Sequence, residues 1–323
     1  MAAVEAEGAV DAWAPMAASV RGAKHVRDSR TNQDAFRYLP QLPAGEGQTP
    51  PPLVMSVADG HGDPRSPRSQ QGAVFAVETA TEVLWRFLQK TASHENLLVV
   101  KRLAEDMLAK QIEREWQRKV DEELAQKPLT PEETRALQGG DGIPPSPGSA
   151  VSEGHRRLAY GTTLVVSAVA PDFLLHLQIG DGDILMVSEG GEVMAPVPPD
   201  AGLVGDQTLS LSREGAWQDF RLRFYARSRA DPALLWLSTD GLSKSFPQAS
   251  DFQAFARDVL ASLRREGARH VGESLPGMLE QTSRDGSGDD ITLGLLFRLP
   301  SAGPGRASER SGGAHVAGKG GAG

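Results

Sequence analysis

The 323-residue sequence contains no cysteine, which excludes disulfides, thiolate zinc sites and cysteine nucleophiles and is compatible with a reducing compartment. It also lacks any apolar stretch close to the roughly 20 residues needed to span a bilayer. Basic residues are in the minority, because 34 Lys and Arg stand against 42 Asp and Glu and give a net charge of −8. We therefore expect neither a nucleic-acid partner nor a membrane partner.

The N-terminal segment Met1–Ala18 has no basic start followed by an apolar block, as a secretory signal would, so we expect a cytoplasmic protein. We interpret this segment as an N-terminal extension and residues 19–299 as one domain. Within the domain, Pro40–Pro52 is predicted to be a loop between strands, and Lys127–Gly154 a flexible insertion rich in proline and glycine. Residues 300–323, rich in Gly, Ser and Ala, are predicted to form a disordered tail.

Hydrophobic periodicity predicts both helices and strands. Helical spacing of apolar residues occurs in Gln70–Lys90, Glu95–Leu124, Asp251–Glu266 and Val271–Thr282. Apolar, β-rich runs predict strands at Leu53–Val57, Thr162–Val169, Phe173–Ile179, Ile184–Ser188, Phe220–Tyr225, Leu234–Ser238 and Ile291–Phe297. Short connections between consecutive strands favour antiparallel pairing. The order of the elements predicts sheets covered by pairs of helices rather than alternating βαβ units.

Three of these apolar runs meet short acidic motifs flanked by glycine. The motifs are Asp59-Gly60-His61-Gly62, Asp240-Gly241 and Gly288-Asp289-Asp290. An Asp before a Gly at the end of a strand is usually only a turn. Several such motifs in one chain instead favour a shared site for a hard divalent cation, and therefore phosphate chemistry.

Convergence of Asp59, Asp240 and Asp289 would make each carboxylate costly to ionise, so the cluster would need cations. His61 lies on a glycine-flanked turn, where it is suited to proton transfer near neutral pH. The motif Gly180-Asp181-Gly182-Asp183 is either a tight hairpin turn or part of the site. A nucleophile elbow and a phosphate-binding loop are both absent from the sequence, which leaves water activated by a metal.

Taken together, the motifs resemble those of the metal-dependent protein phosphatases of type 2C, over roughly Ser19 to Leu299. The matching motifs, in order, are Asn32-Gln33-Asp34-Ala35, Asp59-Gly60-His61-Gly62, Gly161-Thr162-Thr163, Gly180-Asp181-Gly182-Asp183, Ser238-Thr239-Asp240-Gly241 and Gly288-Asp289-Asp290-Ile291-Thr292. The Gln-Asp pair in the first motif is similar to that of a bacterial branch. The resemblance implies an α+β fold, a four-layer α-β-β-α sandwich of two antiparallel sheets flanked by helix pairs.

The resemblance also implies two Mn²⁺ or Mg²⁺ ions at the sheet edge, with a possible third. In this reading Asp59 bridges both ions, the Gly60 carbonyl binds one of them, and Asp34 binds the second directly or through water. Asp240 and Asp289 complete the remaining positions.

Two further roles follow from the resemblance. Asp181 resembles the residue that, together with the counterpart of Asp240, holds a third ion in bacterial members. His61 would protonate the leaving seryl or threonyl oxygen, so that His61, Asp34 and Asp59 are the expected catalytic residues.

The sequence departs from the family pattern at three places. Gln33 stands where Glu is common, and Ser29 stands where the family has a phosphate-contacting Arg. Arg27 or Arg30 could replace that Arg, and we favour Arg30, whose forked guanidinium suits a phosphate. Asp290 replaces the usual Asn and is expected to contact the metal ligands rather than the metal ions.

The leading hypothesis is therefore a phosphoserine and phosphothreonine protein phosphatase that hydrolyses its substrates in one step. Its partners would be phosphorylated proteins, the products of a cognate Ser/Thr kinase. The alternative is a catalytically weak or inactive phosphoprotein-binding or scaffold module on the same fold, which the changes at Gln33 and Ser29 favour. A small phosphorylated molecule as substrate is a third hypothesis.

Overall fold

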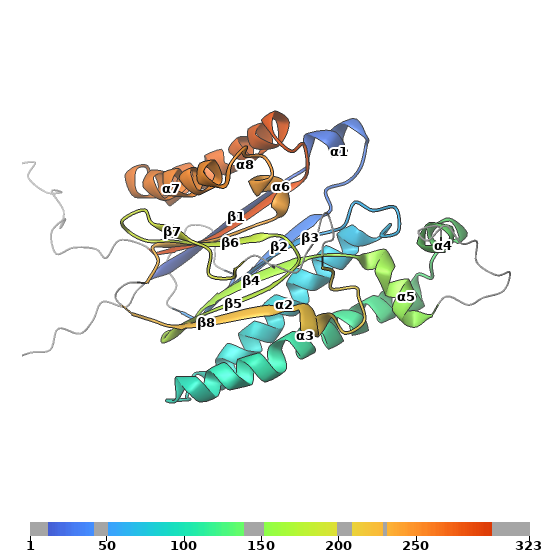
Figure 1. Ribbon diagram of the computed structural model, residues 1–323, viewed down its shortest axis with the longest axis horizontal. Helices are drawn as coiled ribbons and strands as arrows, with labels where there is room; N and C mark the ends of the chain where they lie inside the picture. Colours follow the sequence, from blue (N-terminus) through green and yellow to red (C-terminus); the bar gives the residue numbers. More distant parts are fainter. Residues whose placement is uncertain (1–11, 42–50, 139–151, 199–208, 229–230, 299–323) are drawn as a thin grey trace, which may run out of the picture.

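The computed structural model describes residues 12–41, 51–138, 152–198, 209–228 and 231–298. Within them, two antiparallel five-stranded sheets stack face to face, and a pair of long helices covers the outer face of each sheet (Figure 1). The four-layer α-β-β-α sandwich expected from the sequence is thereby confirmed.

The first sheet has the strand order β1-β10-β9-β6-β7. Its strands are β1 (Trp13–Val20), β10 (Ile291–Arg298), β9 (Leu234–Ser238), β6 (Asp183–Val187) and β7 (Val193–Met194). The helices α7 (Ala249–Arg265) and α8 (Ala268–Asp285) pack on its outer face.

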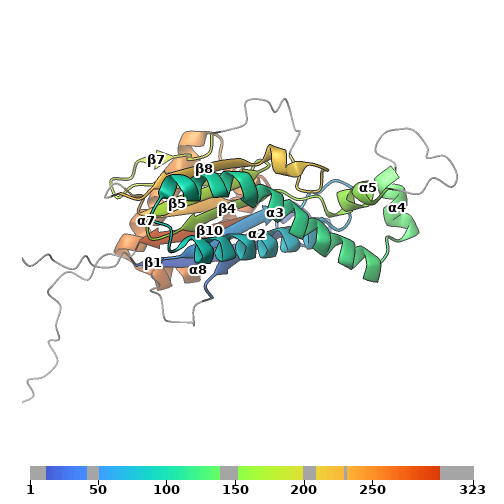
Figure 2. The same cartoon turned by 90° about the horizontal axis from the view of Figure 1, so that it is seen from below.

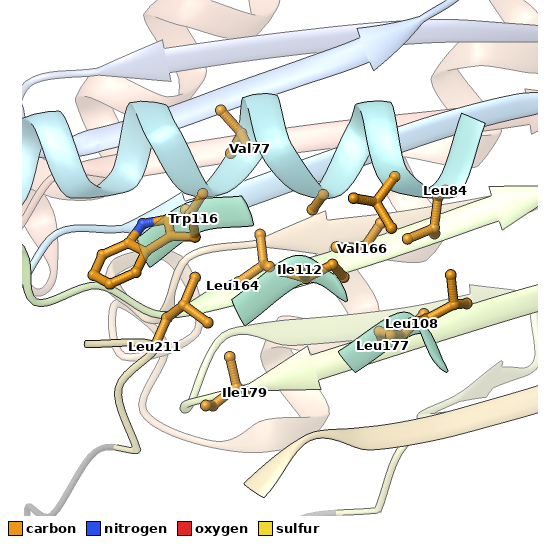
Figure 3. Close-up of a cluster of buried hydrophobic side chains, with 14 of the residues drawn as sticks. Val77, Leu84, Leu108, Ile112, Trp116, Leu164, Val166, Leu177, Ile179 and Leu211 are labelled. Atoms are coloured by element: carbon orange, nitrogen blue, oxygen red, sulfur yellow. The ribbon is translucent and has the colours of Figure 1, made fainter. Parts of the chain in front are cut away.

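The second sheet has the strand order β2-β3-β4-β5-β8. Its strands are β2 (Asp34–Leu39), β3 (Leu53–Asp59), β4 (Leu164–Val169), β5 (Phe173–Ile179) and β8 (Arg221–Ala226). The helices α2 (Ser69–Thr91) and α3 (Leu97–Gln126) cover it. Figure 3 shows side chains of both helices meeting those of the strands beneath them.

Each layer is held by alternating burial of apolar side chains. On β3, Val54 packs toward α2 and α3, whereas Met55 and Val57 pack between the two sheets. Because both faces of this strand are covered, its sequence is a continuous apolar run rather than an alternating one. On α3, a buried residue recurs every fourth position from Val100 to Val120, which forms one apolar stripe against α2.

Shorter helices lie at the ends of the long elements. They are α1 (Ala23–Arg27), α4 (Pro131–Gln138), α5 (Glu153–Arg157) and α6 (Asp240–Ser243), with two 3-10 turns at Leu158–Tyr160 and Ala216–Asp219. Figure 2 shows α4 and α5 together beside one end of α3. An ion pair between Arg157 and Asp121, at 2.6 Å, fastens α5 to α3.

The structure corrects the predicted N-terminal boundary. The segment interpreted as an extension contains β1, which begins at Trp13 and pairs along its whole length with β10. Trp13 is completely buried. Pro15 interrupts the apolar pattern but is tolerated because β1 is an edge strand. Residues 1–11 and the predicted tail 300–323 lie outside the described residues.

The predicted flexible insertion is also partly wrong. Its first part contains α4, which is anchored because the Arg68 guanidinium contacts the Glu133 carboxylate at 2.7 Å and Leu137 is buried. Its last residues begin α5, and residues 139–151 lie outside the described residues.

Of the two alternatives for Gly180–Asp183, a hairpin turn or part of the site, the hairpin is not formed. The strand before it, β5, pairs with β4 and β8 in the second sheet, whereas β6 pairs with β9 and β7 in the first. The short connection therefore crosses from one sheet to the other.

Within the described residues, no helix is both long and apolar enough to cross a membrane.

Candidate metal centre

Asp34 and Asp59 stand at the ends of neighbouring strands. Asp34 begins β2, Asp59 ends β3, and the two residues are direct partners in the register of the sheet. Thr239, which follows β9 in the other sheet, donates its hydroxyl to Asp34 Oδ2 at 2.8 Å. The Asp34 side chain is thus fixed where the edges of the two sheets meet, and its Oδ1 is buried with no hydrogen-bond partner in the part of the chain that the structure describes.

The backbone of Asp59 is held by the Gly161-Thr162-Thr163 motif. The Thr162 hydroxyl donates to the Asp59 carbonyl at 2.9 Å, and the Thr163 amide donates to the same carbonyl at 2.8 Å. The Asp59 amide in turn donates to Thr163 Oγ1 at 3.1 Å. This motif therefore contributes rigidity to the site rather than a charged group.

Gly60 lies where no side chain fits. A Cβ atom at this position would be 2.7 Å from the backbone of Ser69, and the Gly60 amide donates to the Gln33 carbonyl at 3.1 Å. The side-chain amide of Gln33 donates to Ser69 Oγ at 2.7 Å. Its Oε1 is buried and, among the described residues, unpartnered, so it offers a neutral oxygen at the place where the family pattern has a carboxylate.

Asp240 and Asp289 reach the same edge from the first sheet. Asp240 directly follows Thr239 and opens α6, and Asp289 precedes β10. The two segments touch, because a Cβ on Gly241 would be 3.2 Å from the Cβ of Asp289. The Asp289 side chain is 52% exposed, which leaves it open to solvent and to a ligand.

The electrostatics of the cluster are unfavourable without cations. Burial, with the negative charges of Asp290 and Asp240, raises the pKa of Asp34 well above its usual value. Burial, with the charges of Asp34 and Asp240, does the same to the pKa of Asp59. Hard divalent ions would relieve this repulsion, and the donor set, made of carboxylates and a carbonyl, is the one they prefer.

The candidate ligands are not arranged as a complete metal site. Among the described residues, no three His, Cys, Asp or Glu side chains already surround a common point as ligands would. Most predicted ligands are nevertheless brought together around Asp59, because the charges of Asp34, Asp240 and Asp289 all act on its carboxylate. The residues thus fit a divalent metal by chemistry and location.

Asp181 lies on the connection that crosses between the sheets. Burial and the neighbouring Asp240 raise its pKa. Asp183, from the same motif, lies beside it, and burial raises its pKa to about 6. Sequence reasoning missed Lys244, whose ammonium contacts the carboxylates of both Asp240 and Asp181.

His61 is placed next to the cluster by a backbone hydrogen bond, in which its amide donates to the Gly161 carbonyl at 3.0 Å. Its Nε2 atom is buried and has no hydrogen-bond partner in the described parts of the chain. Burial lowers the pKa of His61 although Asp181 and Asp63 lie nearby. The imidazole is thus available for proton transfer to an incoming group.

Arg30 lies beside this histidine. Its Nη1 donates to the Gly62 carbonyl at 3.3 Å, whereas Ser29, at the position of the expected Arg, adopts a positive φ of 55° in the turn that follows α1. The structure therefore brings Arg30 to the histidine loop, and the contact of Arg30 with a substrate phosphate stays a prediction.

Asp290 organises the segment that leads into β2. Its Oδ1 accepts from the Gly22 amide at 2.7 Å, and its Oδ2 accepts from the Gln33 amide at 2.7 Å. His25 Nδ1 lies 2.8 Å from the same Oδ2. One buried carboxylate thereby holds both ends of the segment that carries Arg30. The sequence assigned no role to His25, because its partner is 265 residues away.

Comparisons with known proteins show the family and the fold of this chain. A family model described as protein phosphatase 2C matches residues 21–280. The solved catalytic domain of the serine/threonine phosphatase PstP, in complex with two manganese ions, is 18% identical, with a TM-score of 0.51 over 90% of this chain and 99% of that chain. A Streptococcal relative, the S. agalactiae serine/threonine phosphatase, is 17% identical, with a TM-score of 0.51 over 88% of this chain and 99% of that chain.

A bacterial serine phosphatase is 14% identical, with a TM-score of 0.51 over 89% of this chain and 98% of that chain. No curated protein matches the sequence significantly. At these identities the likeness to solved structures establishes the fold, whereas the family model establishes the family.

Proposed function

This chain belongs to the protein phosphatase 2C family, and we propose that it is a Mn²⁺- or Mg²⁺-dependent phosphatase of phosphoserine and phosphothreonine in proteins. The observation that carries the proposal is the cross-strand pair of Asp34 and Asp59, joined at the sheet edge by Asp240. Buried carboxylates that raise one another's pKa destabilise the fold when they are ionised, so such a cluster favours a cation site.

In this proposal Asp59, the Gly60 carbonyl, Asp34, Asp240 and Asp289 would hold the ions. The bound ions supply charge neutralisation for the phosphoryl group and activation of a water molecule. The protein's own contribution is to hold these oxygens rigidly, through the contacts of Thr162, Thr163 and Thr239 described above.

Arg30 and His61 act on the substrate. The guanidinium of Arg30, beside the Gly62 carbonyl, binds the phosphate oxygens of the substrate through its fork of donors. His61 delivers a proton from Nε2 to the seryl or threonyl oxygen that leaves. Phosphorylated proteins made by a cognate Ser/Thr kinase are the proposed substrates.

A second candidate function is a phosphoprotein-binding module without catalysis. The observation that favours it is the absence, among the described residues, of three side chains already arranged around an ion, together with the neutral Gln33. Calorimetric titration with Mn²⁺ separates the two functions, because a pure binding module has no need of the ions.

The test is hydrolysis of p-nitrophenyl phosphate and of a phosphothreonine peptide with Mn²⁺, with Mg²⁺ and with EDTA. We expect metal-dependent activity that Asp240→Ala abolishes and that Asp258→Ala, an exposed change on α7, leaves intact. Activity that persists in EDTA, or in the Asp240 variant, would overturn the proposal. Absence of turnover together with absence of Mn²⁺ binding would favour the binding module.

A further inference from the structure

Lys244 occupies the space between two of the candidate ligands. It lies one helical turn after Asp240, and its amide donates to the Asp240 carbonyl at 2.8 Å, which fixes the start of its side chain. Its Nζ forms an ion pair with Asp240 Oδ2 and lies 3.4 Å from Asp181 Oδ2. The ammonium therefore bridges one carboxylate on the connection between β5 and β6 and another at the end of β9.

This bridge lies where a third divalent ion is expected from the family resemblance, between Asp181 and Asp240. We propose that Lys244 is a built-in cation that takes the place of the third ion, so that this chain binds two divalent ions rather than three. The inference rests on the proposed function, because it presupposes that the other two ions bind.

Two physical reasons support the replacement. A tethered ammonium is always present beside its carboxylates, whereas a free ion must be captured from solution at its own concentration. An ion that entered between Asp181 and Asp240 would also have to displace the ammonium and then tolerate its positive charge within a few ångströms. Asp183, which is nearly buried beside this pair, adds a third negative charge that Lys244 helps to balance.

The experiment counts Mn²⁺ ions per chain by calorimetry and by elemental analysis after desalting. We expect about two for the wild type and about three for Lys244→Ala, because removal of the ammonium uncovers both carboxylates. Lys244→Gln, which keeps the length and hydrogen bonding of the side chain without its charge, provides a second variant in case the alanine form does not fold. Asp181→Asn in the Lys244→Ala background should return the count to two.

The matched control is Lys101→Ala, which removes an exposed lysine from an ion pair with Glu105 on α3 and should leave the count unchanged. Three ions on the wild type, or an equal count in the wild type and both Lys244 variants, would overturn the inference while leaving the phosphatase proposal intact. A wild type that binds no Mn²⁺ would overturn the phosphatase proposal itself, and this inference with it.

Discussion

Asp34 and Asp59 are direct partners in the register of β2 and β3, so two carboxylates face each other at the end of a strand pair. Like charges directly opposite in a sheet are destabilising. Here the burial of Asp34, which is 8% exposed, increases the cost. The same pair of carboxylates that favours cation binding therefore lowers the stability of the metal-free fold.

Replacing Asp34 by Asn should stabilise the metal-free protein and weaken its response to metal. We expect a gain of about 0.2–1 kcal/mol in EDTA, because one of the two opposed charges is removed and its shape is kept. In Mn²⁺ the wild type should gain stability through binding, and the variant should gain less. Thermal unfolding in EDTA and in Mn²⁺ measures both effects. Asp106→Asn, an exposed change on α3, serves as the control, and a variant less stable than the wild type in EDTA contradicts the argument.

Replacing His61 by Gln should slow hydrolysis according to the leaving group. An alkoxide leaving group needs a proton, so turnover of a phosphothreonine peptide should fall by roughly 10²- to 10³-fold. p-Nitrophenolate leaves without one, so turnover of p-nitrophenyl phosphate should fall much less. Steady-state kcat on the two substrates provides the measurement, with His94→Gln, an exposed histidine after α2, as the control. Equal losses on both substrates would mean that His61 does not donate the proton.

Replacing Arg30 by Ala should raise KM for a phosphopeptide by about tenfold, equivalent to about 1.4 kcal/mol, since one charge-assisted contact to the phosphate is lost. Mn²⁺ affinity should not change, because the Arg30 guanidinium donates to the carbonyl of Gly62, which is not one of the candidate ligands. Arg30→Lys should restore the activity only partly, because the lysine ammonium lacks the planar fork of the guanidinium. Arg27→Ala, on the exposed side of α1, is the matched control, and a larger effect from Arg27 would reverse the assignment.

His176 should make stability depend on pH independently of the metal centre. It is fully buried between the sheets, where its Nδ1 lies 2.8 Å from Ser167 Oγ, and burial lowers its pKa to about 3. In the unfolded chain His176 takes up a proton near pH 6.5, whereas in the folded chain it stays neutral at that pH. Stability from this group is complete above about pH 6.5 and falls by about 1.4 kcal/mol per pH unit between there and about pH 3.

The measurement is denaturant unfolding between pH 4.5 and 7.5 in EDTA, for the wild type and for His176→Gln. The carboxylate cluster titrates with the opposite sign, because the raised pKa values of Asp34 and Asp59 favour the folded protein at low pH. Both proteins contain that cluster, so the difference between them isolates His176. Parallel pH profiles would contradict the prediction.

Much of the site could be predicted because its signals are local. Asp59, Asp240 and Asp289 each border an apolar run and a glycine, and these features reflect the strand and the tight turn directly. The long helices and the fully buried strands were predictable for the same reason, since periodicity records which faces are covered. β1 was missed because its Ala, Ser and Pro residues give a weak β signal, and its place is decided by pairing with β10 at the far end of the chain.

The available chemistry can be read from the sequence alone: carboxylates, a glycine-flanked histidine and no thiol. The order of the predicted helices and strands indicated sheets covered by helices, whereas the four-layer sandwich followed from the family resemblance of the motifs. Contacts between distant residues are established only on folding: Asp34 faces Asp59, Asp290 holds His25, and Lys244 stands between Asp181 and Asp240. The physical reason is that each of these contacts depends on how strands register and sheets stack, and residues far apart in the chain have no local signal of their partners.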